Sequence, residues 1–409
     1  MHEKQRGEGD YIGQRVRTIR ARRGITQQVL ADRIGKSRGS VAKWETGERL
    51  IDSRSTLLAL ASALGVNVAD LTGLADDRLD PAASSIHAAA PEIETALWAE
   101  GDVTDIAPPR PLVDLTAAVL DAERLSVACD YTALGPRMAP LITDCHRHVR
   151  SDSGADRERA QDALASITHT AASVLRSFGH TSLAWTAASA AENAARETGG
   201  TAGLAAVAFT RSQLLLSRPG GMRAALTHAE TTAECLGAQV NSTGEIELCG
   251  MLRLQSGLVA AAMDRDADPY FAEAADQATR LADAAPGQSL LSNPTFGRAN
   301  VTLWRMSAAM ERRDAGQVLT LAPTLPPNDL PSTGRRAQYF VEIGRAHAQR
   351  RSYRESVHAL LRAEHTAPQK VRNMSHVREL VGYMMRTARR DLTTGELGRL
   401  AQRVGAVPA

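Results

Sequence analysis

The sequence predicts an all-α protein, in which a small five-helix domain at the N-terminus precedes a long array of paired helices. Three observations support this fold class. Two short, capped helices lie close together between Gly24 and Gly47. From Leu112 to the end the apolar residues keep a helical spacing and no strand pattern persists. Gly, Pro or Asp interrupts this spacing about every 15 to 25 residues, as expected for consecutive helices joined by short loops.

Length and charge divide the chain in the same way. With 409 residues it is too long for one small helical domain, so two or more units are expected. Up to Leu74 there are 13 Lys and Arg against 8 Asp and Glu, whereas the remainder has 35 against 38. The basic residues are therefore concentrated in the segment that carries the two capped helices, which is typical of a nucleic-acid-binding domain.

The chain begins with a polar segment, residues 1–10, which we expect to be disordered. The first helix follows, with Ile12, Val16 and Ile19 on its inner face. Its basic residues lie mostly outside that face: Arg15, Arg17, Arg20, Arg22 and Arg23. They are either simply solvated or add a sequence-independent attraction to phosphate.

An N-cap residue precedes each of the next two helices: Thr26 before the first and Ser37 before the second. The apolar residues recur on one face of each helix: Leu30 and Ile34 in the first, Val41 and Trp44 in the second. Gly35 supplies the permissive backbone at the end of the first helix. A helix held out on a tight turn can enter the major groove with its N-terminal side chains facing the base edges. Helices from Leu57 to Leu64 and from Val66 to Leu71 then complete a five-helix core.

At these residues the sequence resembles the phage repressor and Cro type of DNA-binding domain, the XRE family of bacterial regulators. The pattern consists of Thr26-Gln27, Leu30-Ala31, Ile34-Gly35, Ser37, Val41, Trp44-Glu45, Gly47, Arg49, Leu57, Leu60-Ala61, Leu64-Gly65-Val66 and Leu71. It implies a helix-turn-helix domain, which we place at residues 11–74. The sequence departs from the pattern in three places: Val29 replaces a Glu, Ala42 replaces a Ser, and the loop from Arg49 to Leu57 is one residue longer and lacks the usual Pro.

The resemblance and the position of the second helix together nominate the DNA contacts. Arg38, Gly39, Ser40 and Lys43 are the candidates to face the base edges in the major groove, and the N-cap Ser37 is a further candidate to bind DNA. The fork of Arg38 matches O6 and N7 of guanine. Gln27, at the start of the first helix of the motif, is expected to contact the phosphate backbone together with the free amides of the helix end. Lys43 and Arg49 are expected to supply positive charge for the same contacts.

Residues 75–111 are interpreted as a linker with one short helix, from Ile86 to Trp98. The remainder, 112–409, resembles a tetratricopeptide-repeat array. Gly344 is followed at repeat offsets by Ser356, Leu360, Ala363 and Pro368. The same offsets recur at Ala172, Ala184, Ala188 and Ala191. The alternative is that Ala-rich helices match these offsets by chance, in which case an all-helical domain still remains.

A repressor-type domain followed by such repeats resembles bacterial regulators in which the repeat domain binds an effector and dimerises. The resemblance implies a peptide or small-molecule effector in a concave groove, for which Arg211, Arg253 and Asn300 are candidates. Structural or solvated roles are the alternative for each. Because one helix-turn-helix reads only a half-site, a homodimer is expected, formed through residues after Leu112.

Other classes of function find little support. Cys145, His146 and His148 are adjacent, but on a helix positions 146 and 148 face different ways, so we predict no metal site. No catalytic residues and no cofactor are predicted. The N-terminus lacks an apolar export segment and no run is long enough to cross a membrane, so a cytoplasmic protein is expected. We therefore interpret the chain as a regulator of transcription that binds double-stranded DNA. The alternative is a repeat scaffold whose helix-turn-helix binds protein, which Gly39 at a reading position would suit.

Overall fold

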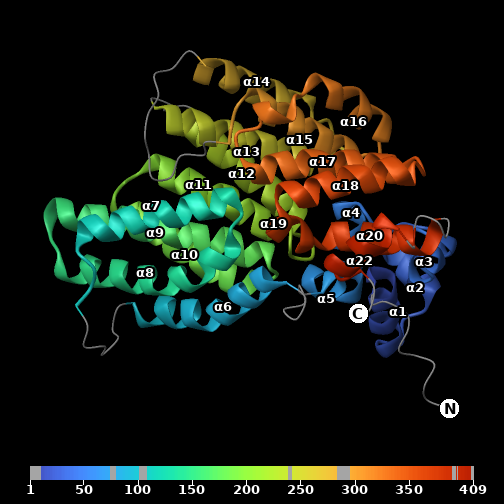
Figure 1. The fold of residues 1–409 in the computed structure, drawn as a ribbon, viewed down its shortest axis with the longest axis horizontal. Coiled ribbons are helices and arrows are strands. Elements are labelled where there is room, and N and C mark those ends of the chain that lie inside the picture. Colours follow the sequence, from blue (N-terminus) through green and yellow to red (C-terminus); the bar gives the residue numbers. More distant parts are fainter. Residues whose placement is uncertain are drawn as a thin grey trace.

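The computed structural model describes residues 11–73, 80–100, 108–237, 242–282, 295–388, 393 and 395–406. These residues form helices joined by turns and loops, without any β-strand, so the predicted all-α fold class is confirmed. A small N-terminal bundle lies at one end of a larger array of helices (Figure 1). Within the described ranges, no helix is both long and apolar enough to cross a membrane.

The N-terminal bundle has the five helices that the sequence predicts. They are α1 (Ile12–Arg22), α2 (Gln27–Arg33), α3 (Arg38–Glu45), α4 (Arg54–Leu64) and α5 (Val68–Thr72). Their apolar faces enclose a core of their own, which includes Val16, Leu30, Val41, Leu60 and Leu64. Trp44 also belongs to this core, with only 2% of its surface exposed, as the sequence analysis expected.

The segment that was interpreted as a linker contains a longer helix than expected. In place of a short helix from Ile86 to Trp98, α6 runs from Pro81 to Ala99. It begins earlier because the Asp80 carboxylate accepts hydrogen bonds from the N–H groups of Ala82 and Ala83, with Pro81 at the first helical position. Ile86 and Ile93 are fully buried in the core of the array, so α6 is part of that array.

The array continues through the rest of the described chain. Its helices are α7 (Leu112–Ala128), α8 (Tyr131–Ser151), α9 (Gly154–Ser177), α10 (Thr181–Glu197), α11 (Thr201–Leu215), α12 (Gly221–Gly237), α13 (Thr243–Ala262), α14 (Asp268–Ala282), α15 (Arg298–Glu311), α16 (Ala315–Leu321), α17 (Thr333–Gln349), α18 (Tyr353–Thr366), α19 (Pro368–Arg372), α20 (Ser375–Thr387) and α22 (Glu396–Arg403). Two short 3₁₀ turns, Ala322–Thr324 and Pro327–Asp329, lead into α17.

Small residues allow the predicted helix pairs to pack closely. Between α17 and α18, the hydroxyl of Ser356 donates a hydrogen bond to the carbonyl of Gly344 at 2.8 Å. A Cβ atom at Gly344 would lie 2.9 Å from Cγ of Leu360, which is closer than real packing allows. Between α9 and α10, Ala172 and its partners Ala184, Ala188 and Ala191 are all buried. The sequence offsets therefore mark helix pairs, as predicted.

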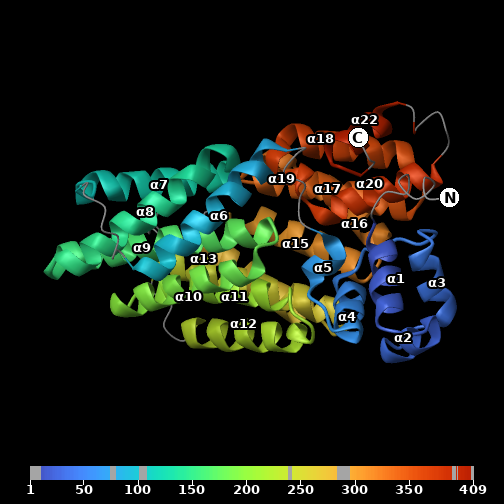
Figure 2. The ribbon, with the colours of Figure 1, turned by 90° about the horizontal axis from the view of Figure 1, so that it is seen from below.

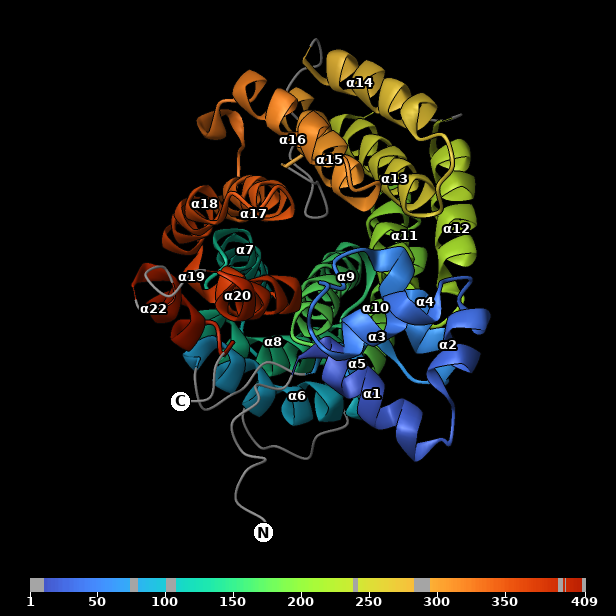
Figure 3. The same cartoon turned by 90° about the vertical axis from the view of Figure 1, so that its right-hand side faces the viewer.

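The end of the array is tied back to its beginning (Figure 3). On α19, the Gln369 side chain accepts a hydrogen bond from the Thr132 N–H at 2.9 Å and donates one to Asp130 at 3.0 Å. The Asn373 amide donates to Asp80, the residue that caps α6, at 3.1 Å. Because these contacts join residues more than 200 positions apart, α6 to α22 close into one unit rather than an open superhelix.

The N-terminal bundle is docked on the C-terminal helices of the array through polar contacts. The N–H of Ile12, at the start of α1, donates to Glu379 on α20 at 3.1 Å. The N–H of Arg54, at the start of α4, donates to Glu311 at the end of α15 at 2.9 Å. Figures 1 and 2 both show α1 and α4 beside this end of the array, whereas α7 to α9 lie at the opposite end.

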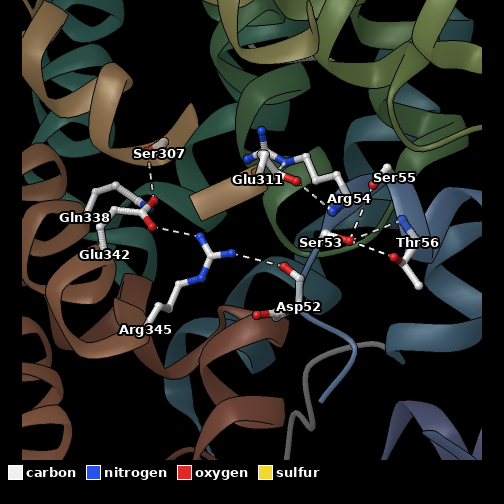
Figure 4. Close-up of polar contacts among 10 residues, drawn as sticks. All are labelled: Asp52, Ser53, Arg54, Ser55, Thr56, Ser307, Glu311, Gln338, Glu342 and Arg345. Carbon is white, nitrogen blue, oxygen red and sulfur yellow. Dashed lines mark hydrogen bonds and ion pairs between the residues drawn. The ribbon is translucent and has the colours of Figure 1, made fainter. Parts of the chain in front are cut away.

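The central contact of this junction is Arg345 of α17 (Figure 4). Its guanidinium donates to the carbonyl of Asp52 at 3.0 Å and to the carboxylate of Glu342 at 2.7 Å. Glu342 is 1% exposed and also accepts hydrogen bonds from Ser307 and Gln338. Burial alone would raise the pKa of Glu342, but Arg345 and these hydrogen bonds outweigh it and lower the pKa. Glu342 is therefore ionised and fixes Arg345 against the loop that follows α3.

The helix pair α17–α18 can be tested at its closest point. We expect Gly344→Ala to lower the free energy of unfolding by about 1–3 kcal/mol, because the added methyl group must displace Leu360. The control is Gly39→Ala on α3, where the new methyl group meets only Ser37 Oγ at 3.9 Å and should stabilise by up to about 1 kcal/mol. Thermal melting followed by circular dichroism compares them. An equal gain in both variants would refute the close packing.

Candidate nucleic-acid interface

Helices α2 and α3 are joined by a turn whose geometry is fixed by caps. The Thr26 hydroxyl accepts a hydrogen bond from the Val29 N–H at 3.2 Å, and the Ser37 hydroxyl accepts one from the Ser40 N–H at 3.2 Å. Gly35, at φ +63°, takes the left-handed conformation that ends α2. Both predicted N-caps are confirmed, and a side-chain cap of this kind contributes about 1 kcal/mol to its helix.

The side chains at the start of α3 face outward. Ser37 and Arg38 are exposed there, and Ser40 is half-buried with its hydroxyl 3.1 Å from that of Ser37. Lys43, in the last turn of α3, is also exposed. Helices α2 and α3 lie at the end of the molecule farthest from α7 (Figure 2). The bundle therefore presents the start of its second motif helix without obstruction from the described part of the array. This is the arrangement that entry into a major groove requires.

Arg38 shares a surface hollow with the first helix of the motif. Gln27 and Gln28 of α2 and Arg20 of α1 line the same hollow. The structure thus brings Gln27 and Arg38 together, as expected for one candidate to contact phosphate beside one candidate to read bases. Arg20 was not singled out for this position from the sequence.

A buried carboxylate, Glu45 at the end of α3, holds this surface together. Its two oxygens accept hydrogen bonds from Nε and Nη2 of Arg20 at 2.6 and 2.9 Å. The amide of Gln27 donates to the same carboxylate at 2.8 Å, and Arg20 also donates to the carbonyl of Ile25 at 2.7 Å. Glu45 is 3% exposed, and its hydrogen bonds raise the pKa of Arg20. Arg20 therefore joins α1 to both motif helices and is not one of a set of solvated arginines.

The same contacts add a positioning role for Gln27. Its amide nitrogen uses one of its two N–H groups for Glu45, so the side chain helps to hold α2 in place, and its expected contact with phosphate stays a prediction. The pairing of Arg20 with Glu45 could not be predicted from the sequence, because the two residues are 25 positions apart and no local pattern links them.

Arg49 lies apart from the other candidates. It follows α3, and its guanidinium is 6.0 Å from the centroid of the Trp44 ring. It also lines a cavity between the bundle and the array, together with Arg313 and Arg351. The structure does not bring Arg49 together with Arg38, so its expected contact with the DNA backbone stays a prediction.

The three candidates for an effector groove already have partners within the chain. Arg211 forms an ion pair with Glu192 and lies over the ring of Trp185, 4.9 Å from its centroid. Arg253 is paired with Glu273 at 2.7 Å.

Asn300 is 1% exposed, and its amide donates to the sulfur of Met251 at 3.3 Å, so it packs between α13 and α15. This contact fits the structural role given as the alternative for Asn300, and binding of an effector by Asn300 stays a prediction.

Comparison with known proteins agrees with the geometry of the bundle. Residues 12–74 match a family described as "Helix-turn-helix domain". The N-terminal bundle is thus a helix-turn-helix domain; the match covers less than half of the chain and leaves the array unassigned. No curated protein sequence matches the chain.

One similar solved structure is described as "Crystal Structure of Bacillus thuringiensis PlcR in complex with the peptide PapR7 and DNA". The identity is 11%, the alignment covers 84% of this chain and 99% of that one, and the TM-score is 0.26. A TM-score this low does not extend the ligands of that protein to this chain.

The role of Glu45 can be tested by removing its charge. We expect Glu45→Gln to lower the stability of the helix-turn-helix domain by about 1–3 kcal/mol, because Arg20 is left half-enclosed without a carboxylate. Glu48→Gln is the matched control, since Glu48 is exposed and its loss should change stability by less than about 0.5 kcal/mol. Thermal melting of both variants compares the loss of stability at the two positions. Equal melting temperatures would mean that the carboxylate is not structural.

Proposed function

We propose that the protein is a regulator of transcription that binds double-stranded DNA, with Ser37, Arg38, Ser40 and Lys43 at the major groove. The observation that carries this proposal is the exposed start of α3, held on a capped turn within a helix-turn-helix domain. The basic excess of the N-terminal segment supports it, because phosphate neutralisation supplies most of the affinity for non-specific DNA. The function requires no catalytic group.

Binding as a homodimer is part of the proposal, because one such helix reads only a half-site. An exposed apolar stripe supports a seam on α7. Val113, Leu120 and Val127 recur one heptad apart on this helix, and their exposed fractions are 76%, 37% and 41%. Apolar residues at this spacing are typical of a helix that packs against a second helix. A second copy of the chain is the occupant that a twofold DNA site calls for.

Base reading is tested first by substitution of Arg38. An operator is obtained by selecting genomic fragments with the purified full-length protein, and affinities for operator and random DNA are then compared at several salt concentrations. Arg38→Ala should weaken operator binding by about 1–3 kcal/mol and change random binding much less. The control is Arg22→Ala, which removes an exposed arginine of α1. Equal losses for both DNA molecules would contradict a base-reading role for Arg38. Absence of salt-dependent binding would favour a scaffold instead.

The seam is tested by placing a charge in the apolar stripe. Leu120→Glu should convert the dimer to a monomer in sedimentation velocity, because a carboxylate would be buried without a partner at the seam. Ser182→Glu, at an exposed position of α10, adds the same charge elsewhere and should leave the dimer intact. A wild-type protein that sediments as a monomer, with or without operator DNA, would refute the dimer itself. A Leu120→Glu dimer would refute only this location.

A further inference from the structure

A cavity of about 210 Å³ lies where the helix-turn-helix domain meets the array. Arg49 and Asp52, from the loop after α3, line one side of it. Arg313, Arg345, Arg351 and His376, from the array, line the other. Any molecule in this cavity would touch both parts of the chain at once.

The lining has a strong excess of positive charge. Four guanidinium groups face one carboxylate, that of Asp52, which is 3.6 Å from Arg313. The charge of Arg345 is balanced from behind by Glu342. Arg49 and Arg351 have no carboxylate partner among the described residues. Even with Glu342 included, the site holds two more positive than negative charges. Like charges that line one cavity repel one another, and an anion between them would relieve that repulsion.

A buried nitrogen without a partner lies in the same lining. The Nε2 atom of His376 is inaccessible to solvent and makes no hydrogen bond within the described residues. Burial, reinforced by the charge of Arg345, lowers the pKa of His376 to about 3, so the ring is neutral at physiological pH. His376 therefore adds no positive charge to the lining, and the charge excess comes from the arginines alone.

Two of the arginines are held in the cavity lining by an unusual backbone. Arg313 and Arg351 have φ values of +59° and +61°, directly beyond the ends of α15 and α17. Glycine or asparagine is the usual residue in this conformation after a helix. Arginine at both positions directs two guanidinium groups to the same space.

We propose that this cavity is a binding site for a compact polyanion, a small molecule with at least two phosphate or carboxylate groups. Its volume holds several water molecules but is smaller than a typical pocket for a drug-sized ligand. The anion bridges Arg49 of the helix-turn-helix domain to Arg313 and Arg351 of the array. The small-molecule effector expected from the sequence would then act at the domain junction rather than in a groove of the repeats.

Binding of such a ligand would be coupled to the binding of DNA. By joining the two parts it stabilises the docked orientation of α3, and it alters operator affinity to the extent that docked and undocked orientations differ in their fit to DNA. This consequence rests on the proposed function, whereas binding of the anion does not.

The binding step is tested on the full-length chain without DNA. Pyrophosphate and citrate serve as the phosphate and carboxylate probes in isothermal titration calorimetry and thermal melting, with ionic strength held constant by sodium chloride. At least one probe should bind saturably with one site per chain and raise the melting temperature. Comparison of the two identifies which kind of anion the site prefers.

Substitutions then locate the site. The double variant Arg313→Asn, Arg351→Asn removes two charges but suits the left-handed backbone, because asparagine tolerates it. Its affinity for the bound probe should fall at least about tenfold, since each lost contact is a charged hydrogen bond. The matched control is Arg312→Asn, Arg350→Asn, which removes the same charge from neighbouring exposed residues outside the cavity lining. The control should bind within about twofold of wild type, as is usual for exposed positions.

Two results would overturn the proposal. One is the absence of saturable binding of both probes up to about 10 mM, which would be a very weak interaction. The other is an equal loss in the double variant and its control. If neither probe binds and the double variant loses operator affinity, the arginines contact the DNA backbone and the cavity is not a ligand site. Because the probes are measured without DNA, failure of this proposal is separate from failure of the DNA-binding function.

Discussion

The arrangement of the helix-turn-helix domain on the array depends on the hydrogen bond from Arg345 to the carbonyl of Asp52. Arg345 can hold that carbonyl because Glu342, buried and ionised, fixes its guanidinium from the other side. Removal of either partner would leave an unpaired buried charge, which typically costs about 3–5 kcal/mol. Glu311 makes a second contact of this kind between the array and the domain, because its carboxylate accepts a hydrogen bond from the N–H of Arg54 at the start of α4. The orientation of the helix-turn-helix domain is therefore set by its contacts with the array.

This junction connects the array to the helix that would read DNA. The loop that Arg345 holds follows α3 directly, so a displacement at Asp52 is also a displacement at the end of the helix that would read DNA. The array is itself closed by the contacts of Gln369 and Asn373, which limits how far α17 and α20 can move independently of α6 and α8. Two candidate control points, the cavity and the apolar stripe of α7, thus act on one connected body.

What could be predicted from the sequence is what local chemistry determines. Thr26 and Ser37 are N-caps wherever a helix follows them, and the offsets around Gly344 and Ser356 mark a close helix pair because only small residues fit there. Contacts between residues that are distant in the chain have no such local pattern in the sequence. The ion pair of Arg20 with Glu45 joins residues 25 positions apart, and the contact of Asn300 with Met251 joins residues 49 positions apart. The loop from Arg49 to Leu57 departs from the repressor pattern in sequence, and the structure uses that loop to dock the domain.

A distance measurement across the junction tests the central claim most directly. One spin label is attached to the native Cys235, which is exposed on α12 while the other cysteines are buried, and a second to Val29→Cys on the exposed face of α2. Labelled protein is diluted with unlabelled protein, so that only distances within one chain contribute to double electron–electron resonance. If the array fixes the helix-turn-helix domain, the distribution is narrow with a single maximum, and Glu342→Gln broadens it. A broad distribution in the otherwise unaltered chain would contradict the account.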